Sequence, residues 1–99
     1  MIIEITQFKL VAGVSDEEFL KEAEAVQKSF LKKQSGYIDR ELLKSDDDLW
    51  VDILHWNSMG EAQKAAEVMM DDPATQDFMQ KIDPSSVKML HLTQMKIWK

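Results

Sequence analysis

The stretch that decides the fold runs from Trp50 to Asp83 and reads WVDILHWNSMGEAQKAAEVMMDDPATQDFMQKID. Its first seven residues alternate between two faces and are rich in β-branched and aromatic side chains, which predicts a strand. Asn57 or Ser58 can cap the helix that follows, in which small and apolar residues recur at helical spacing. Pro73 then breaks this helix, because the residue before a proline is pushed out of helical geometry. The stretch therefore predicts a strand followed by two helices, of which the second is short.

The residues on either side supply the remaining elements. Residues 2–11 alternate with period two and predict a strand, and Ser15 with Glu18 forms a capping box that begins a long helix. Gly36 is predicted to end that helix in a left-handed conformation. Residues 37–45 and 49–56 are separated by three aspartates, which indicates a hairpin, and residues 87–98 predict a long last strand. The predicted order is β-α-β-β-α-α-β.

This order predicts a single α+β domain over residues 1–99, ferredoxin-like, with a four-stranded antiparallel sheet and its helices on one side. Both faces of the first strand are apolar: Ile3 and Ile5 lie on one, and Ile2 and Phe8 on the other. The helices of a chain of 99 residues can cover only one sheet face. We therefore expect the other face to bury against a second copy in a homodimer, shielding Trp56 and Leu92 from water.

Composition and charge exclude several classes of protein. The net charge is −6 and the basic residues are interleaved with acids, which argues against nucleic acid as a partner. With no cysteine, the chain has no disulfide scaffold and no thiolate nucleophile. The first residues, MIIEITQFKL, alternate and carry charges, so they resemble neither a signal peptide nor a membrane span. A soluble, cytoplasmic protein with no membrane partner is the expectation.

Four short motifs carry a resemblance to a known family: Gly36-Tyr37-Ile38, residues 40–43 (RELL), residues 55–58 (HWNS), and Asp72-Pro73 with Phe78. Over nearly the whole chain the sequence resembles the antibiotic-biosynthesis-monooxygenase-like family of dimeric α+β barrels. Members of this family oxidise aromatic polyketides without a bound cofactor, degrade haem, or have no known activity. The resemblance thus implies a fold and a cavity, but not a reaction.

The haem-degrading branch of the family can be compared position by position. Its members carry an Asn in the first strand, a Trp on the second helix and a His on the third. The corresponding positions here are Gln7, then Ala65 or Ala66, and a segment from Thr75 to Phe78 that contains no histidine. Because the axial ligand is missing, we do not expect haem degradation. The sequence also shows no motif for another cofactor, so none is expected.

The alignment with the family places the odd positions of the first strand, including Gln7, toward the helices. Gln7 and His55 are the candidate catalytic and ligand-binding residues of a pocket there, and His91 is a further candidate ligand contact. An imidazole can exchange a proton at neutral pH, so either histidine could act on a ligand. The plainer alternatives stay open: a glutamine bonded to backbone, and histidines that are only hydrogen-bonded in their strands. Two histidines without a third ligand make no metal site.

Trp50 and Trp56 share one face of their strand. Trp56 is a candidate ligand contact because an aromatic pair at this spacing can stack on a flat molecule, although tryptophan at a dimer interface is the commoner meaning. Asp39 and Glu41 resemble paired carboxylates, but partners for neighbouring cations or a solvated edge explain them as well.

The chain contains no nucleophile–base triad, no phosphate-cradling glycine loop and no carboxylate-rich metal cage. Any enzyme built on it must position a reactive substrate in a dry cavity. The predicted function is a cofactor-independent monooxygenase-like protein acting on a small hydrophobic, aromatic or quinol-type ligand. The alternative is a non-catalytic or stress-related dimer that only binds such a ligand.

Overall fold

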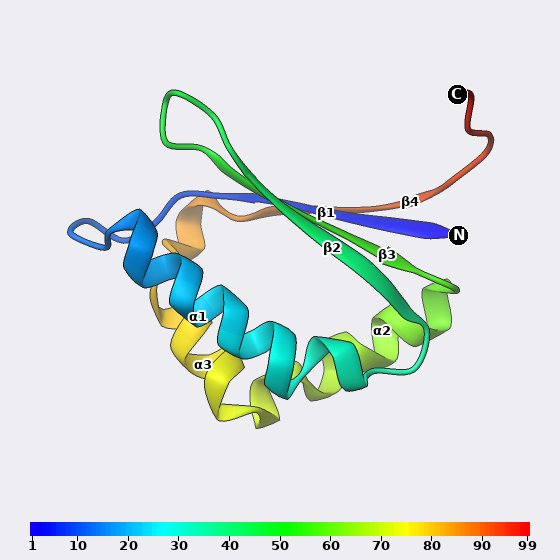
Figure 1. The fold of residues 1–99 in the computed structure, drawn as a ribbon, viewed down its shortest axis with the longest axis horizontal. Helices are drawn as coiled ribbons and strands as arrows, with labels where there is room; N and C mark the ends of the chain where they lie inside the picture. Colours follow the sequence, from blue (N-terminus) through cyan, green and yellow to red (C-terminus); the bar gives the residue numbers. More distant parts are fainter.

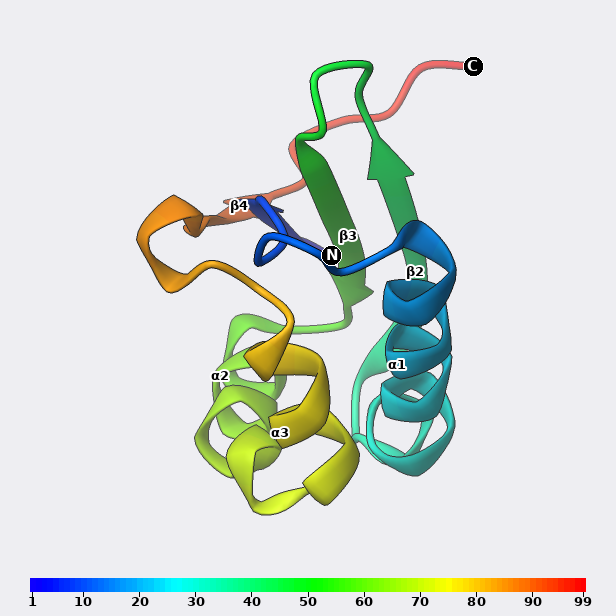
Figure 2. The ribbon, with the colours of Figure 1, turned by 90° about the vertical axis from the view of Figure 1, so that its left-hand side faces the viewer.

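The computed structural model describes all 99 residues and contains one antiparallel sheet with the helices packed on one side, as Figures 1 and 2 show. Along the chain, the strands and α-helices are β1 (Ile2–Phe8), α1 (Asp16–Ser29), β2 (Tyr37–Lys44), β3 (Trp50–Trp56), α2 (Met59–Val68), α3 (Pro73–Gln80) and β4 (Lys88–Thr93). The strand order across the sheet is β2-β3-β1-β4. The predicted ferredoxin-like α+β order is confirmed.

Local hydrogen bonds explain where the helices begin. The Ser15 hydroxyl accepts from the Glu18 amide at 3.1 Å and begins α1, and Ser58, rather than Asn57, accepts from the Glu61 amide at 3.2 Å and begins α2. The prediction that the first helix continues to Gly36 is wrong. α1 stops at Ser29, and a short 3₁₀ turn follows it. Gly36 has a φ of +83°, a conformation that favours glycine.

The side chains at even positions of β1 and β3 point toward the helices. Trp50, Leu54 and Trp56 of β3 are buried against the helices, as are Ile2 and Phe8 of β1. The prediction that odd positions of β1 face the helices is therefore wrong. Because both faces of β1 carry apolar residues, the sequence pattern of this strand does not show which face the helices cover.

Aromatic side chains form the centre of the core between the sheet and the helices. Phe19 of α1 packs against Phe8, Trp50 and Phe78 with ring centroids 5.5, 5.0 and 4.9 Å apart. Trp56 is only 1% exposed and meets Tyr37 edge to face at 5.8 Å. The expectation that Trp56 is shielded by a second subunit is wrong, because its own helical layer already buries it.

The opposite side of the sheet has no helix over it. We call this surface the open sheet face; its apolar residues are Ile3, Ile5, Leu43, Val51, Ile53, Leu90 and Leu92. Leu90 and Leu92 are 56% and 44% exposed in the single chain. Leu92 thus lies where the sequence placed it, on a face that the helices leave bare.

The last strand is shorter than predicted. β4 pairs only with β1, and the amide of Gln94, which donates to the Met1 carbonyl at 3.0 Å, makes the final bond between them. The residues after 94 make no further ladder bonds to β1, and Figure 1 shows them leaving the sheet. This tail exposes Met95, Ile97 and Trp98, the last of them by 77%. None of the helices is long and apolar enough to cross a membrane.

Candidate functional site

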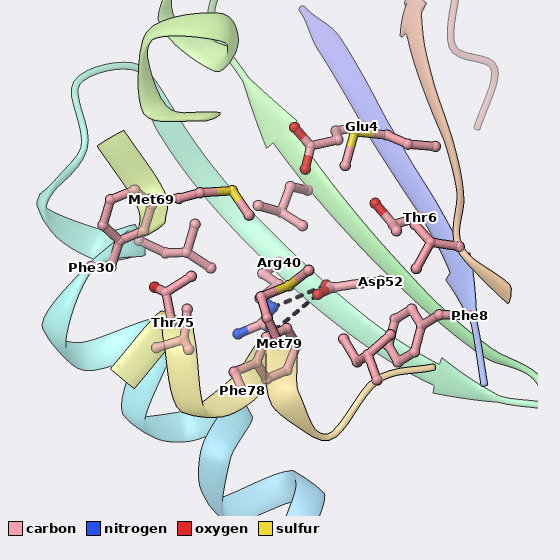
Figure 3. A pocket seen from close by; sticks show the side chains of 16 residues that line it. Glu4, Thr6, Phe8, Phe30, Arg40, Asp52, Met69, Thr75, Phe78 and Met79 are labelled. Carbon is pink, nitrogen blue, oxygen red and sulfur yellow. Dashed lines mark hydrogen bonds and ion pairs between the residues drawn. The ribbon is translucent and has the colours of Figure 1, made fainter. Parts of the chain in front are cut away.

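A cavity of about 120 Å³ lies between the sheet and the helical layer, and Figure 3 shows the side chains around it. All four strands, α1 and α3 contribute to its lining of 16 residues, of which 11 are hydrophobic. The remaining five are polar: Glu4, Thr6, Arg40, Asp52 and Thr75. The cavity therefore suits an apolar ligand that carries a small number of polar groups.

Three methionines, Met69, Met79 and Met89, form part of the cavity wall. Ligand pockets commonly measure roughly 300–1,000 Å³, so this cavity is small for a ring system as it stands. Methionine is unbranched and adapts its shape readily. This part of the wall can therefore change shape through its side chains, without a movement of the backbone.

Arg40 and Asp52 form a buried ion pair in the wall of the cavity. Arg40 Nε and Nη2 donate to the two carboxylate oxygens of Asp52, each at 2.9 Å, and Nη1 donates to the Ala23 carbonyl at 2.9 Å. The two side chains are 8% and 10% exposed, and the guanidinium lies 5.5 Å from the Phe78 ring centre. Asp52 is thereby held as a charged acceptor for Arg40, which leaves it poorly placed to take a proton from a ligand.

Glu4 brings a second carboxylate to the cavity, from the neighbouring strand. Its Oε1 lies 3.0 Å from Nε2 of His91, which stands directly opposite on β4. The side chains are 14% exposed for Glu4 and 25% for His91, so the pair lies at the edge of the core. Figure 3 shows the oxygens of Glu4 and Thr6 directed from β1 toward the helical side of the cavity. This carboxylate–imidazole pair can hold or move a proton at the cavity edge.

Thr75 reaches the cavity from the first turn of α3, where Asp72 fixes it. Asp72 Oδ2 accepts hydrogen bonds from the Thr75 amide at 3.0 Å, the Thr75 hydroxyl at 3.1 Å and the Ser29 hydroxyl at 2.9 Å. Burial acts to raise the pKa of Asp72, but these donors outweigh it and leave the pKa below its ordinary value. Because its hydroxyl proton is given to Asp72, Thr75 can offer a ligand only a lone pair.

The structure separates the residues predicted from sequence to share a pocket. Gln7 is exposed on the open sheet face, and the His55 ring pairs there with Asp39. The prediction that Gln7 and His55 line the pocket beneath the helices is wrong, because both occupy odd positions relative to the buried residues of their strands. Trp56 faces the helices but does not line the cavity. His91 is bonded to a lining residue, and the catalytic role of His55 stays a prediction.

Sequence reasoning missed Glu4, Arg40 and Asp52 as cavity residues. One signal was present: Glu4 and Asp52 each stand among apolar residues on the strand face that carries the buried aromatic side chains. A charged residue in such a place must be paired or functional. With the correct face assigned to β1, the same alternation would have found Glu4.

A scan against protein-family models finds no match for this sequence, and neither does a comparison with curated proteins. Solved structures do match. SnoaB, a cofactor-independent oxygenase from Streptomyces nogalater, is 15% identical, with 97% of this chain and 94% of that one covered and a TM-score of 0.78. A candidate antibiotic biosynthesis monooxygenase from Bordetella bronchiseptica is 11% identical, with coverage of 96% and 97% and a TM-score of 0.77.

A third match is a candidate antibiotic biosynthesis monooxygenase from Deinococcus radiodurans, 10% identical, with coverage of 100% and 97% and a TM-score of 0.74. At these identities the likeness is one of fold. The resemblance found in the sequence is confirmed at that level: this chain has the fold of SnoaB and of the antibiotic-biosynthesis-monooxygenase-like structures.

Proposed function

We propose that the protein is a cofactor-independent monooxygenase-like protein that takes a small aromatic or quinol-type ligand into the cavity between sheet and helices. The observation that carries the proposal is the composition of the lining. Eleven hydrophobic side chains line the cavity together with the Arg40–Asp52 ion pair, the Glu4 carboxylate and two threonine hydroxyls. Such a lining excludes water from a flat apolar molecule while leaving a group that can take its proton. The fold shared with SnoaB supports the same reading.

The chemistry that suits this lining needs dioxygen as the only co-reactant. Loss of a proton makes an electron-rich aromatic a stronger electron donor, so the substrate anion itself can reduce dioxygen. With an anthrone, two C–H bonds of the ring methylene break and a carbonyl forms there. One oxygen atom of dioxygen ends in that carbonyl and the other leaves as water, which balances the reaction. The protein contributes a dry site, orientation and a proton acceptor.

A second function is favoured by the size of the cavity. At about 120 Å³ it is closer to a packing space than to an open active site. A non-catalytic protein that binds a small hydrophobic ligand, with the methionine wall closing around it, would have the same lining. Such a binder needs shape and a hydrogen-bond partner, but no proton transfer.

The assembly we propose is a homodimer joined through the open sheet face. Its support is the row of apolar side chains that run across three neighbouring strands, with Ile5 between Ile53 and Leu90 in register. Contiguous exposed apolar surface of this kind marks an interaction site in most soluble proteins. In a two-fold dimer the open sheet face of each subunit would cover that of the other.

Oxygen consumption with a panel of anthrones, quinols and flavonols, run beside thermal-shift binding of the same compounds, tests the function. Oxygen uptake supports the enzyme, stabilisation without uptake supports the binder, and silence in both assays contradicts both. Met89→Trp should plug the cavity and abolish uptake and stabilisation together, since Met89 lines it and is half exposed. Gln80→Trp, on an exposed position of α3, is the matched control.

The same assay tests the predicted role of His55. A general base contributes roughly 10²–10⁴-fold to a rate, so loss of uptake by that factor in His55→Ala would support a catalytic His55. Because His55 faces away from the cavity, the structure favours a variant with uptake close to that of the wild type.

A further inference from the structure

We propose that Glu4 is the proton acceptor of the cavity, with His91 as its positioning residue, and that the ligand enters as a neutral, weakly acidic hydroxyarene. The inference rests on the proposed function, because it names the base and the ligand's protonation state for the same cavity. It assigns the proton-accepting role, which the sequence had suggested for a histidine or for Gln7, to Glu4.

Only two carboxylates line the cavity, and their hydrogen bonds distinguish them. Both oxygens of Asp52 are occupied by Arg40. In Glu4, Oε1 is occupied by His91 Nε2, and Oε2 makes no hydrogen bond within the chain. A proton acceptor needs a free lone pair within reach of the ligand. Oε2 of Glu4 accepts no hydrogen bond, whereas each oxygen of Asp52 already accepts one from the Arg40 guanidinium, whose positive charge makes Asp52 the weaker proton acceptor.

The charges of the lining indicate which form of the ligand is accepted. Glu4 and Asp52 contribute two negative charges and Arg40 one positive charge, which is already paired with Asp52. No lysine or arginine forms an ion pair with Glu4, whose partner is the His91 ring. An anionic ligand would therefore meet the Glu4 carboxylate in largely apolar surroundings, where like charges repel strongly. A neutral hydroxyl meets no such repulsion and can donate a hydrogen bond to Glu4 Oε2.

The step that follows is a single proton transfer. The O–H bond of the ligand, which in an anthrone is that of its enol tautomer, breaks, a new O–H bond forms at Glu4 Oε2, and the electron pair stays on the ligand. The negative charge moves from Glu4 to the ligand, so the total charge of the cavity is unchanged. The ligand then holds the electron-rich form that reacts with dioxygen.

His91 acts through Glu4. With a proton on Nε2, its ring donates to Oε1 and so fixes the orientation of the Glu4 carboxylate at the cavity edge. The register of the sheet supports this geometry, because Glu4 and His91 stand directly opposite one another on paired strands. Without that donor, the glutamate side chain is free to rotate toward solvent at the cavity edge.

The test is the pH dependence of 4-nitrophenol binding, which requires no dioxygen. In the wild type, affinity should fall about tenfold for each pH unit above the phenol's own pKa, because the phenolate must enter beside charged Glu4. Glu4→Gln keeps the shape and removes the charge. The ratio of its affinity to that of the wild type should rise at least tenfold as pH passes through the ionisation of nitrophenol.

Variants of His91 test whether this residue positions the Glu4 carboxylate or only stabilises the fold. His91→Gln retains an N–H donor and should keep the wild-type pH profile, whereas His91→Leu should approach the profile of Glu4→Gln. Glu67→Gln, an exposed carboxylate on α2, is the control and should match the wild type. Identical pH profiles for the wild type and Glu4→Gln, or failure of the wild type to bind nitrophenol, would overturn the inference.

Oxygen uptake then distinguishes this inference from the function on which it rests. If anthrone turnover exists and Glu4→Gln lowers it by roughly 10²–10⁴-fold, both stand. If turnover is absent but the nitrophenol signature is present, Glu4 is the acceptor in a binding protein and the oxygenase proposal fails. If turnover is present and Glu4→Gln leaves it unchanged, the oxygenase stands and Glu4 is not its base.

Discussion

At the scale of single residues, the buried pair of Arg40 and Asp52 has the most definite consequence for stability. Both side chains are nearly buried, and each supplies the other's counter-charge. Removing one partner of such a pair commonly costs about 3–5 kcal/mol, because the other charge stays buried without compensation. We therefore expect Asp52→Asn to lower the free energy of unfolding by about that amount in a urea titration.

The double variant Arg40→Met with Asp52→Leu should recover most of this loss, since two apolar side chains need no counter-charge. Asp16→Asn is the comparison: it breaks the ion pair with Lys44, which is far more exposed, and should cost clearly less. A loss in Asp52→Asn no greater than in Asp16→Asn would show that the buried pair does not stabilise the fold.

The same scale shows what the sequence could not decide. A shift of one residue in β1 would replace Glu4 and Thr6 by Gln7 on the cavity side. In either register each face of the strand carries at least one isoleucine. The choice depends on Phe8 and Ile2 packing under the helices, which is a property of three-dimensional contacts. The ion pair between Arg40 and Asp52 joins two strands, so it too could not be predicted from a single sequence.

At the scale of elements, α3 depends on Asp72, the capping residue that precedes it. Asp72 caps the helix through Thr75 and also holds the Ser29 hydroxyl of α1. Replacing a capping aspartate by alanine costs about 0.5–2 kcal/mol, so Asp72→Ala should lower the thermal midpoint. Asp72→Asn keeps an acceptor for the cap and should lose less.

The pH dependence of that stabilisation has a definite sign. The pKa of Asp72 is lowered in the folded protein, mainly by donors that outweigh its burial. Its stabilisation is therefore complete above the unfolded pKa of 3.8 and is lost as pH falls through the lower folded value. The stability difference between the wild type and Asp72→Asn, measured by urea titration, should shrink below about pH 4. A difference that stays constant in that range would contradict this.

Elements were the level at which the sequence was most informative. The caps at Ser15 and Ser58 and the break before Pro73 are local signals, and the structure forms helices where they stand. The last strand was overestimated because alternation continues to Trp98, whereas a strand also needs a hydrogen-bonded partner, and its pairing with β1 stops at Gln94. Local patterns therefore predicted starts better than ends.

At the scale of the whole molecule, the open sheet face determines the expected assembly. Light scattering at micromolar concentration should show a dimer. Leu92→Asp would place an unpaired charge in its interface at a cost of several kcal/mol, and should give monomers or unfolded protein. Met70→Asp is a matched control, because Met70 is 47% exposed, much as Leu92 is at 44%, but lies on the helical side. A monomeric wild type would contradict the proposed pairing.

One of the three tryptophans is exposed and two are buried, so tryptophan fluorescence can report on the tail separately from the core. Trp50 and Trp56 are enclosed by the core, whereas Trp98 on the tail stands almost wholly in water. In the single chain, iodide should therefore quench one emitting population and spare the other. If the tail also packs against a second subunit, dilution should expose Trp98 and shift its emission to longer wavelength, so that assembly can be followed by fluorescence without any label.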